Sequence, residues 1–269
     1  MKYPGFLDKA VTLSYDDGTA TDKRLVEIMR GYGLSGTFNI CTLADEAGGY
    51  KLSYDEAREI FKDGIEVAVH GERHLTWTEV EPAVAMRDIM ANRERLEKIF
   101  GKIINGCAYP CGAYNDTVVD ILKNAGINYA RTTVATEDFR LPTDWLRMPA
   151  TCHHNNPRLF ELVDKFLGIE KASYFWSNKP RLFYLWGHSA EFKRDDNWDL
   201  IERFGEKIGG RKDVWYATNG EIYDYVRAFN RLIFSVDLTY VENPSALDVY
   251  VNILGKELVV PAGKTVEIK

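Results

Sequence analysis

Short apolar runs alternate with longer amphipathic stretches along most of this chain, and no other feature limits the possible folds as strongly. The runs are rich in β-branched and aromatic residues, whereas the stretches between them place apolar residues at helical spacing. Alternation of strands with helices favours a mainly parallel sheet that helices cover on both faces. We therefore predict an α/β fold, a (β/α) barrel that is incomplete or distorted and has about seven strands. The predicted strands are residues 11–15, 36–41, 65–70, 103–109, 128–133, 181–187 and 213–217.

The helical stretches have recognisable ends. Ser53 and Glu56 form a capping-box pattern at the start of a stretch that ends near Gly64, and Gly101 ends a longer one. Each stretch gathers its apolar residues on one face, as a helix that packs on a sheet requires. The predicted helices cover residues 21–30, 53–64, 82–100, 115–125, 157–167, 197–208 and 219–229.

The alternation stops near Phe229, and the remaining residues have the pattern of short strands separated by turn sequences. A β-rich segment of about 40 residues rarely supports a hydrophobic core of its own. We therefore expect one large unit over residues 1–228 and a small β extension over residues 229–269 that packs on it. The strands expected in the extension are Leu232–Asp237, Leu247–Ile253, Leu258–Val260 and Thr265–Ile268.

The charge and hydropathy of the chain exclude some partners. The 34 basic and 40 acidic residues give a net charge of −6, and no basic cluster interleaves with aromatic residues, so nucleic acid is not expected as a partner. No run of about 18 apolar residues predicts a membrane segment, and the first six residues lack the apolar core of a signal peptide. Four scattered cysteines fit a reducing compartment. We expect a cytoplasmic protein, and the sequence leaves its oligomeric state open.

Two polar segments directly follow predicted strands. Asp16 and Asp17 follow the first strand, and His70 and His74 follow the third. Because parallel strands present their carboxyl ends on one face of a barrel, these side chains are expected to meet there. Histidines at positions i and i+4 lie on the same side of a helical turn. Two imidazoles and one carboxylate form an open site for a divalent metal ion, with room for a further ligand.

Each segment also has a simpler interpretation. Asp17-Gly18 is a common turn sequence, and paired histidines are often surface residues or hydrogen-bonded core residues. The pattern is not that of an H-E-x-x-H metalloprotease, because Gly71 stands where the glutamate would follow the first histidine. The convergence of both pairs at strand ends favours the metal site over these alternatives.

Four segments resemble motifs of the polysaccharide deacetylase family, also known as the NodB homology domain or carbohydrate esterase family 4. The resemblance covers residues 1–228, and the segments follow one another in the family's order. Each segment lies at the end of a predicted strand, which makes the match specific. They are Ser14–Gly18 for T-F-D-D-G, His70–His74 for H-[ST]-x-x-H, Ala108–Gly112 for R-x-P-Y-G and Leu185–His188 for L-x-H.

The resemblance implies a role for each matching residue. Asp16 would be the general base that activates water, and His188 the general acid that protonates the leaving amine or alcohol. The backbone N–H of Cys111 would stabilise the oxyanion, and this donor does not depend on the cysteine side chain. One divalent metal ion is implied, zinc in most members, with cobalt, nickel or manganese as alternatives. Its implied ligands are Asp17, His70 and His74.

Three departures from the family pattern matter. Ala108 replaces the arginine that orients the catalytic aspartate in the family, so another cation must act on Asp16. We predict that this cation is Arg131, at the end of a strand, with Arg147 as the second choice. Gly71 replaces a serine or threonine in the second motif, which removes a hydroxyl and keeps the metal ligands. The fourth motif, D-x-x-D-W, has only an incomplete counterpart at residues 143–145.

Aromatic and histidine side chains near the strand ends are candidates for substrate contacts. Tyr109, Trp186 and His154 are predicted to line the substrate site, because flat rings suit sugar faces. The adjacent His153 and His154 also fit a polar loop without a ligand.

These residues together predict a metal-dependent hydrolase that removes acetyl groups from N- or O-acetylated carbohydrate, so an acetylated sugar or oligosaccharide is the expected partner. Two alternatives stay open: the same fold and metal site acting on a small non-sugar amide, and a catalytically idle homologue that binds sugar. A cysteine nucleophile at Cys111 paired with His188 is a weaker hypothesis, because it leaves the aspartate and histidine pairs without a purpose.

Overall fold

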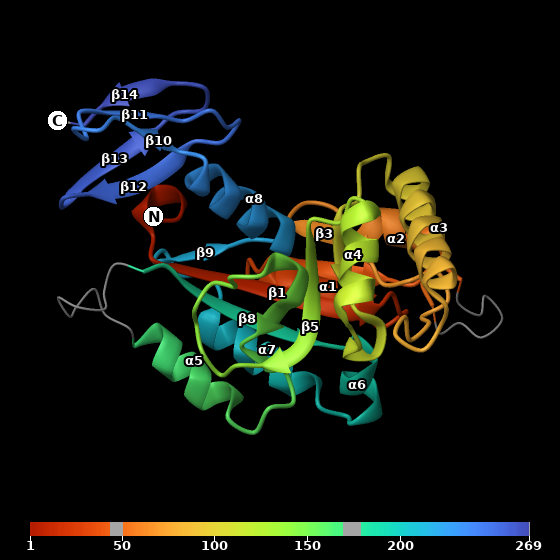
Figure 1. Ribbon diagram of the computed structural model, residues 1–269. Helices are drawn as coiled ribbons and strands as arrows, with labels where there is room; N and C mark the ends of the chain where they lie inside the picture. Colours follow the sequence, from red (N-terminus) through yellow and green to blue (C-terminus); the bar gives the residue numbers. More distant parts are fainter. Residues whose placement is uncertain (44–50, 169–178, 269) are drawn as a thin grey trace.

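The central element of the fold is one large sheet of parallel strands (Figure 1). The computed structural model describes residues 1–43, 51–168 and 179–268 of the chain. Nine strands belong to this sheet. They are β1 (Lys9–Asp17), β2 (Gly36–Ile40), β3 (Ile65–Val69), β4 (Gly106–Ala108), β5 (Tyr129–Ala135), β6 (Met148–Ala150), β7 (Cys152–His153), β8 (Arg181–Gly187) and β9 (Val214–Tyr216).

The large sheet closes on itself through one short segment. The strand order is β6-β5-β4-β3-β2-β1-β8-β7, and β9 pairs with the start of β1. β6 and β7 are separated in the chain by Thr151 alone, so one continuous segment pairs with β5 at its start and with β8 at its end. The backbone N–H of Thr151 donates to the carbonyl of Tyr184 over 2.9 Å. With β6 and β7 counted as one interrupted strand, the sheet has eight strands. The distorted (β/α) barrel that the sequence predicts is confirmed, and all seven predicted strands are present, whereas the β6–β7 segment is not predicted.

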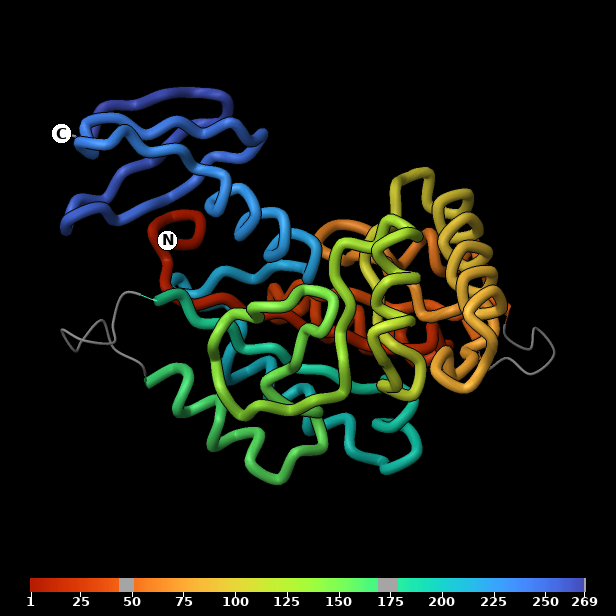
Figure 2. Tube along the Cα trace, in the orientation of Figure 1, coloured from red at the N-terminus to blue at the C-terminus, as the bar shows by residue number. Residues whose placement is uncertain are grey.

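Helices cover the outside of the barrel, and the sequence predicts most of them (Figures 1 and 2). All seven predicted helices are present among the described residues, and α2 ends earlier than expected, at Ile60. α6 is not predicted, because six residues are too few to show a helical period. None of the described helices is long and apolar enough to cross a membrane. The helices are α1 (Asp22–Gly31), α2 (Tyr54–Ile60), α3 (Pro82–Phe100), α4 (Asp116–Asn124), α5 (Leu159–Leu167), α6 (Ser189–Arg194), α7 (Trp198–Ile208) and α8 (Asn219–Asn230), with short 3-10 turns η1 (Pro4–Phe6), η2 (Pro110–Gly112) and η3 (Trp145–Arg147).

The two faces of β1 differ sharply in chemistry. Val11, Leu13 and Tyr15 belong to the main hydrophobic core, which includes residues of the surrounding helices. The alternate residues are polar and equally buried: Thr12 donates to Asn219 Oδ1 over 3.0 Å, and Ser14 Oγ accepts from Asn39 Nδ2 over 2.9 Å. Because side chains alternate along a strand, Asp16 continues this polar row. The polar side of β1 therefore carries a hydrogen-bonded network, and the carboxylate of Asp16 lies at the end of this row near the carboxyl end of the strand.

The C-terminal residues form two small antiparallel sheets beside the N-terminus (Figure 1). They share a small apolar core with the end of α8, and the hydroxyl of Tyr225 in α8 accepts from the N–H of Tyr250 over 2.9 Å. The predicted packing of this extension on the barrel agrees with these contacts, and its definition as a separate domain from residue 229 stays a prediction. The strands are β10 (Ile233–Phe234), β11 (Tyr240–Glu242), β12 (Val249–Ile253), β13 (Lys256–Val260) and β14 (Thr265–Glu267).

Candidate active site

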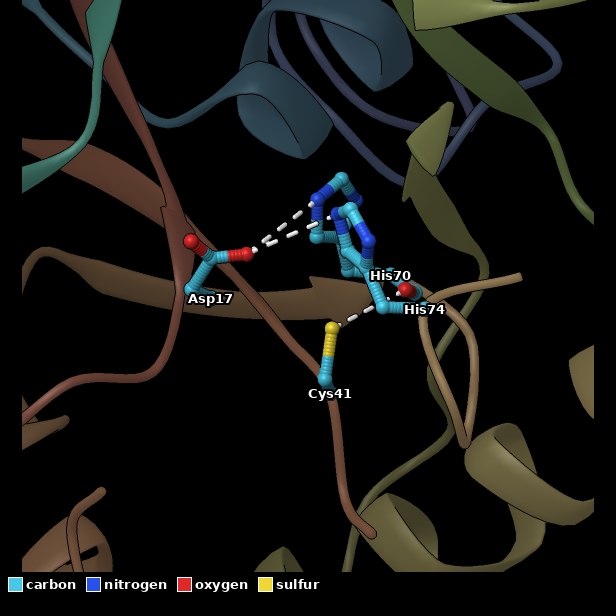
Figure 3. A group of neighbouring side chains, drawn as sticks. All are labelled: Asp17, Cys41, His70 and His74. Carbon is cyan, nitrogen blue, oxygen red and sulfur yellow. Dashed lines mark hydrogen bonds and ion pairs between the residues drawn. The ribbon is translucent and has the colours of Figure 1, made fainter. Parts of the chain in front are cut away.

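Two strand ends bring a carboxylate and two imidazoles together. Asp17 ends β1, whereas His70 and His74 lie in the loop after β3 (Figure 3). Asp17 Oδ1 lies 3.7 Å from Nε2 of His70 and 3.7 Å from Nε2 of His74. A cation with ligand bonds of about 2.0–2.2 Å holds neighbouring donor atoms roughly 3.4 Å apart in tetrahedral geometry. The spacing of the three donor atoms therefore fits a single divalent ion.

The ring orientation of His70 is set by its surroundings. Nδ1 lies 2.9 Å from the carbonyl oxygen of Ala108, which can only accept, so the ring proton is on Nδ1 and the Nε2 lone pair faces Asp17. Burial lowers the pKa of His70 below its usual value, so the ring stays neutral. A neutral, oriented imidazole is the form that binds a metal ion.

The loop that carries His74 explains one departure from the family pattern. Gly71 has φ of 80°, and a Cβ atom there would lie 2.6 Å from Asp88 Oδ2. Asp88, on α3, accepts from the N–H of Arg73 and from the indole of Trp77, each over 2.9 Å. Asp88 thus fixes the loop between the two histidines, and a serine or threonine at position 71 would collide with it.

A cysteine lies beside the three donor atoms and is not one of the ligands that we assign. The thiol of Cys41 lies within 4.8 Å of the donor atoms of Asp17, His70 and His74. It donates to the carbonyl of His70 over 3.1 Å, and burial raises the pKa of the Cys41 thiol. A protonated thiol is a poor metal ligand. Cys41 is therefore left out of the predicted ligand set, which stays Asp17, His70 and His74.

Asp16 lies next to the metal-binding set and is held by an arginine. The Nη2 group of Arg131 donates to both carboxylate oxygens of Asp16, and Asn39 Nδ2 donates to Oδ1 over 2.9 Å. Burial acts to raise the pKa of Asp16, but the charge of Arg131, with smaller contributions from His70 and His188, lowers it to about 2. Asp16 is therefore ionised across the working pH range.

Arg131 reaches Asp16 from the strand next to the one that carries the arginine in the family. Ala108 on β4 and Arg131 on β5 are register partners, so their side chains start at the same height in the barrel. Arg131 is fully buried, and its guanidinium carbon lies 4.5 Å from the ring centre of Trp186. The cation expected beside Asp16 is present, whereas Arg147, the second choice, pairs with the exposed Asp116 and Asp144.

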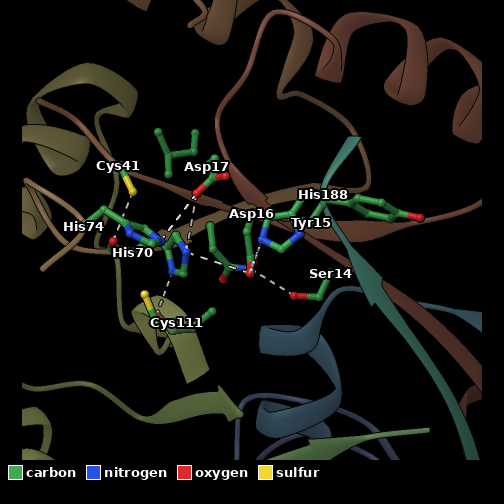
Figure 4. Close-up of polar contacts among 12 residues, drawn as sticks. Ser14, Tyr15, Asp16, Asp17, Cys41, His70, His74, Cys111 and His188 are labelled. Carbon is green, nitrogen blue, oxygen red and sulfur yellow. Dashed lines mark hydrogen bonds and ion pairs between the residues drawn. The ribbon is translucent and has the colours of Figure 1, made fainter. Parts of the chain in front are cut away.

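His188 and Cys111 flank Asp16 and His70 (Figure 4). Nε2 of His188 lies 3.9 Å from Asp16 Oδ2. Cys111, in η2, has φ of 56°, and its N–H has no hydrogen-bond acceptor among the described residues. Its thiol contacts Thr76 Oγ1 at 3.7 Å, and no histidine of the described chain pairs with it, which argues against a cysteine nucleophile.

Sequence reasoning missed one acidic residue of the site. Glu191, on α6, lies within 3.5 Å of three imidazoles, those of His153, His154 and His188. Glutamate is common on helix surfaces, so neither its type nor its spacing from the motifs marks it in the sequence. Its place three residues after His188, on one turn of helix, is the only signal that the sequence contains.

Burial corrects two of the predicted substrate contacts. Tyr109 is 1 % exposed and donates to the carbonyl of Leu146, and His154 is 0 % exposed and stacks on Phe192. Neither side chain faces the solvent side of the site, so the prediction that they contact substrate is wrong for this structure. Trp186 is half-buried between Arg131 and the loop histidines and stays a candidate.

The fold and the site define a class: a (β/α)-barrel protein with carboxylates and imidazoles gathered at the carboxyl ends of its strands. The model of the polysaccharide deacetylase family matches residues 5–130, a little under half of the chain. The matched segment contains Asp16, Asp17, His70, His74 and Cys111, and it ends one residue before Arg131.

Solved structures share the fold at low sequence identity. The putative polysaccharide deacetylase of Mycobacterium smegmatis aligns with a TM-score of 0.63 and 16 % identity, over 86 % of this chain and 94 % of that one. Puue allantoinase aligns with a TM-score of 0.61 and 13 % identity, over 82 % and 91 % of the two chains. A Streptococcus pyogenes deacetylase in complex with acetate aligns with a TM-score of 0.46 and 21 % identity, over 51 % of this chain and 61 % of its own length. No curated protein sequence matches the chain.

Proposed function

We propose that this chain is a metal-dependent carbohydrate deacetylase that hydrolyses the acetyl group of an N- or O-acetylated sugar. The observation that carries the proposal is the convergence of two chemically different pairs at one end of the barrel. Asp17 Oδ1 faces the Nε2 atoms of both His70 and His74, and Asp16 lies beside them, ionised and held by Arg131. The carboxyl ends of the strands are the end of a barrel at which substrates are bound.

Asp17, His70 and His74 would hold the divalent ion, zinc by the preference of two imidazoles and one carboxylate. The ion would supply Lewis acidity, which lowers the pKa of a water molecule and polarises the acetyl carbonyl. The fixed tautomer of His70 and the open side of the set both fit this use.

The remaining residues supply proton transfer and charge stabilisation. Asp16 accepts a proton from the attacking water; its Oδ2 lies 3.8 Å from His70 Nε2 and 3.9 Å from His188 Nε2, so it faces the space between them. The N–H of Cys111 donates to the oxygen that becomes negative as the carbonyl carbon turns tetrahedral. His188 then gives its proton to the leaving amine or alcohol, which departs neutral and leaves acetate.

The test is acetate release from acetylated chito-oligosaccharides by the purified chain, compared with the His188→Ala variant. We expect acetate from the wild type and a loss of about 10²- to 10⁴-fold in kcat for the variant, the usual contribution of a general acid. Acetate release that is equal in both proteins would contradict the assignment of His188.

A small non-sugar amide is the second candidate substrate. An allantoinase shares the fold almost as closely as a deacetylase does, with TM-scores of 0.61 and 0.63. Because fold alone does not fix a substrate, the same assay includes a cyclic amide. Turnover of the cyclic amide without acetate release from sugars would replace the carbohydrate assignment and keep the site.

A further inference from the structure

Three imidazoles surround the carboxylate of Glu191, beside the proposed active site. Oε2 of Glu191 lies 3.1 Å from Nε2 of His153 and 3.0 Å from Nε2 of His154. Oε1 lies 3.5 Å from Nδ1 of His188 and 3.8 Å from the guanidinium of Arg194. The side chain of Glu191 is 17 % exposed, so most of its surface is in contact with these neighbours.

The Nε2 atom of His153 faces the carboxylate of Glu191. The N–H of Asn155 donates to Nδ1 of His153 over 3.1 Å, so this nitrogen carries the lone pair. The proton of the neutral ring is then on Nε2, which points at Glu191. A metal ion at Nε2 would need the lone pair there instead, so a second metal site formed by His153, His188 and Glu191 does not fit this structure.

The buried ring of His154 lies beside the same carboxylate oxygen. Its ring is fully buried and stacks on Phe192 with ring centres 4.2 Å apart. Gly187 leaves room for it, since a Cβ atom at position 187 would lie 2.0 Å from Nδ1 of His154. Oε2 of Glu191 therefore faces two imidazoles, and Oε1 faces His188.

The imidazole of His188 spans the distance from Glu191 to Asp16. Nδ1 faces Glu191 Oε1 at 3.5 Å, and Nε2 faces Asp16 Oδ2 at 3.9 Å. Nδ1 is buried and makes no hydrogen bond among the described residues, so Glu191 is the carboxylate nearest to an unpaired buried nitrogen. The contact with Glu191 is at the outer limit of a hydrogen bond, and catalytic hydrogen bonds of this length commonly shorten when substrate binds.

We propose that Glu191 is a positioning residue for His188: it accepts the Nδ1 proton of the imidazole and so directs Nε2 toward Asp16 and the leaving group. The catalytic consequence rests on the proposed deacetylase function, whereas the hydrogen bond itself does not. Because an ionised partner stabilises the imidazolium, Glu191 also keeps His188 able to donate a proton.

The helix that carries Glu191 is anchored to the loop after β1. Ser189 donates to Asp22, and its hydroxyl also lies 3.0 Å from Thr19 Oγ1 and 2.7 Å from Thr21 Oγ1. These contacts connect the start of α6 with the segment that follows Asp17. His188 and Glu191 thus keep a fixed place relative to the carboxylates of β1.

The wild-type chain provides the first test, and this test needs no substrate. Nitrogen-15 NMR of the histidine rings identifies the tautomer of His188 at a pH where the ring is neutral. We expect the proton on Nδ1 and the lone pair on Nε2. Because the chain has only five histidines, the His188→Ala spectrum assigns the signal. A neutral His188 with its proton on Nε2 overturns the proposal.

The second test is a double-mutant cycle on the full chain. Glu191→Gln keeps the shape of the side chain and removes its charge, and we expect kcat to fall about 10- to 100-fold with little change in KM. In the His188→Ala background, Glu191→Gln should cause no further loss, because Glu191 acts through His188. An equal loss in both backgrounds overturns the proposal.

The groups that face His188 define the third readout. They are the carboxylates of Asp16 and Asp17 on β1, Glu191 on α6, and the rings of His153 and Trp186. Removal of the Glu191 charge should move the basic limb of the activity profile, and the NMR titration of His188, to lower pH. An unmoved titration overturns the proposal.

Glu202→Gln is the matched control for the cycle. Glu202 lies on α7, pairs with the exposed Arg24 and makes no contact with the residues that surround Glu191 in the described structure. We expect this variant to keep wild-type kcat and the wild-type His188 spectrum. If neither the wild type nor any variant releases acetate, the proposed function fails. The tautomer of His188 is measured without substrate, so it still decides whether Glu191 accepts the Nδ1 proton of His188.

Discussion

Arg131 donates to both carboxylate oxygens of Asp16, although the two residues are 115 positions apart in the chain. The arginine starts from β5, at the height of its register partner Ala108 on β4. A guanidinium moved by one strand therefore reaches the same carboxylate, because a long side chain crosses the narrow interior of a small barrel. The absence of arginine at position 108 does not leave Asp16 without a cation.

Removal of this cation is expected to cost both stability and activity. Arg131→Met leaves the buried Asp16 without a charged partner, and breaking a buried pair in this way typically costs about 3–5 kcal/mol. Urea denaturation measures the stability, and acetate release measures the activity. Arg147→Met is the matched control: its ion pairs involve exposed aspartates, so the expected change is within about 1 kcal/mol. Similar stability losses for the two variants would contradict the account.

The pH profile should show a basic limb that belongs to His188. Burial acts to lower the pKa of His188, but the nearby carboxylate of Glu191 and the charges of Asp16 and Asp17 raise it above the usual value. The protonated acid therefore persists above the ordinary histidine range of about 6.5, and activity is lost as the pH rises through the higher pKa. A profile of kcat/KM against pH measures the limb. A limb below the ordinary histidine value would count against His188 as the acid.

Asp22 is expected to lower the stability of the protein as the pH rises, whereas most native carboxylates have the opposite effect. It is fully buried, Oδ2 has no partner among the described residues, and burial raises the pKa of Asp22 to about 8. Between the unfolded pKa of 3.8 and this value, the native state keeps a proton that the unfolded chain releases, so stability falls as the pH rises.

Asp22→Asn removes this titration and keeps the acceptor for Ser189. We expect equal stability of variant and wild type near pH 4, and a variant more stable by on the order of 3 kcal/mol near pH 8. Thermal unfolding at both pH values measures the difference. A variant that is less stable than the wild type near pH 8 would show that Asp22 is ionised in the native state.

Gly187 should not accept a side chain. A Cβ atom there would lie 2.0 Å from His154, which is fully buried and has no space to move. We expect Gly187→Ala to lower the free energy of unfolding by about 1–3 kcal/mol. Gly31→Ala is the control, since a Cβ atom at Gly31 meets nothing within 4 Å, and it should be neutral or slightly stabilising. Chemical denaturation compares them, and equal midpoints would contradict the packing described here.

The barrel and the meeting of two residue pairs could be predicted from the sequence, because both follow from periodicity. Strand and helix periods locate most elements, and parallel strands bring Asp17 and His70 to one face. β6 and β7 could not be predicted, because they are three and two residues long and Pro149 interrupts the pattern.

Residues that act through tertiary contacts were harder to find. Arg131 could be predicted, because Ala108 replaces the arginine of the motif and another cation must then pair with Asp16. No motif position corresponds to Glu191, and only the packing of α6 brings it to three imidazoles. The burial of His154 depends on the missing side chain of Gly187, a long-range effect that no local pattern reveals.

The central claim is that Asp17, His70 and His74 bind one divalent metal ion, and metal content by mass spectrometry tests it most directly. We predict about one ion per chain in the wild type and none in His74→Ala, whose side chain is partly exposed and tolerates removal. His153→Ala, a histidine outside the set, should retain the ion. A wild-type chain without metal after reconstitution, or a His74→Ala variant that binds it as tightly, would contradict the account.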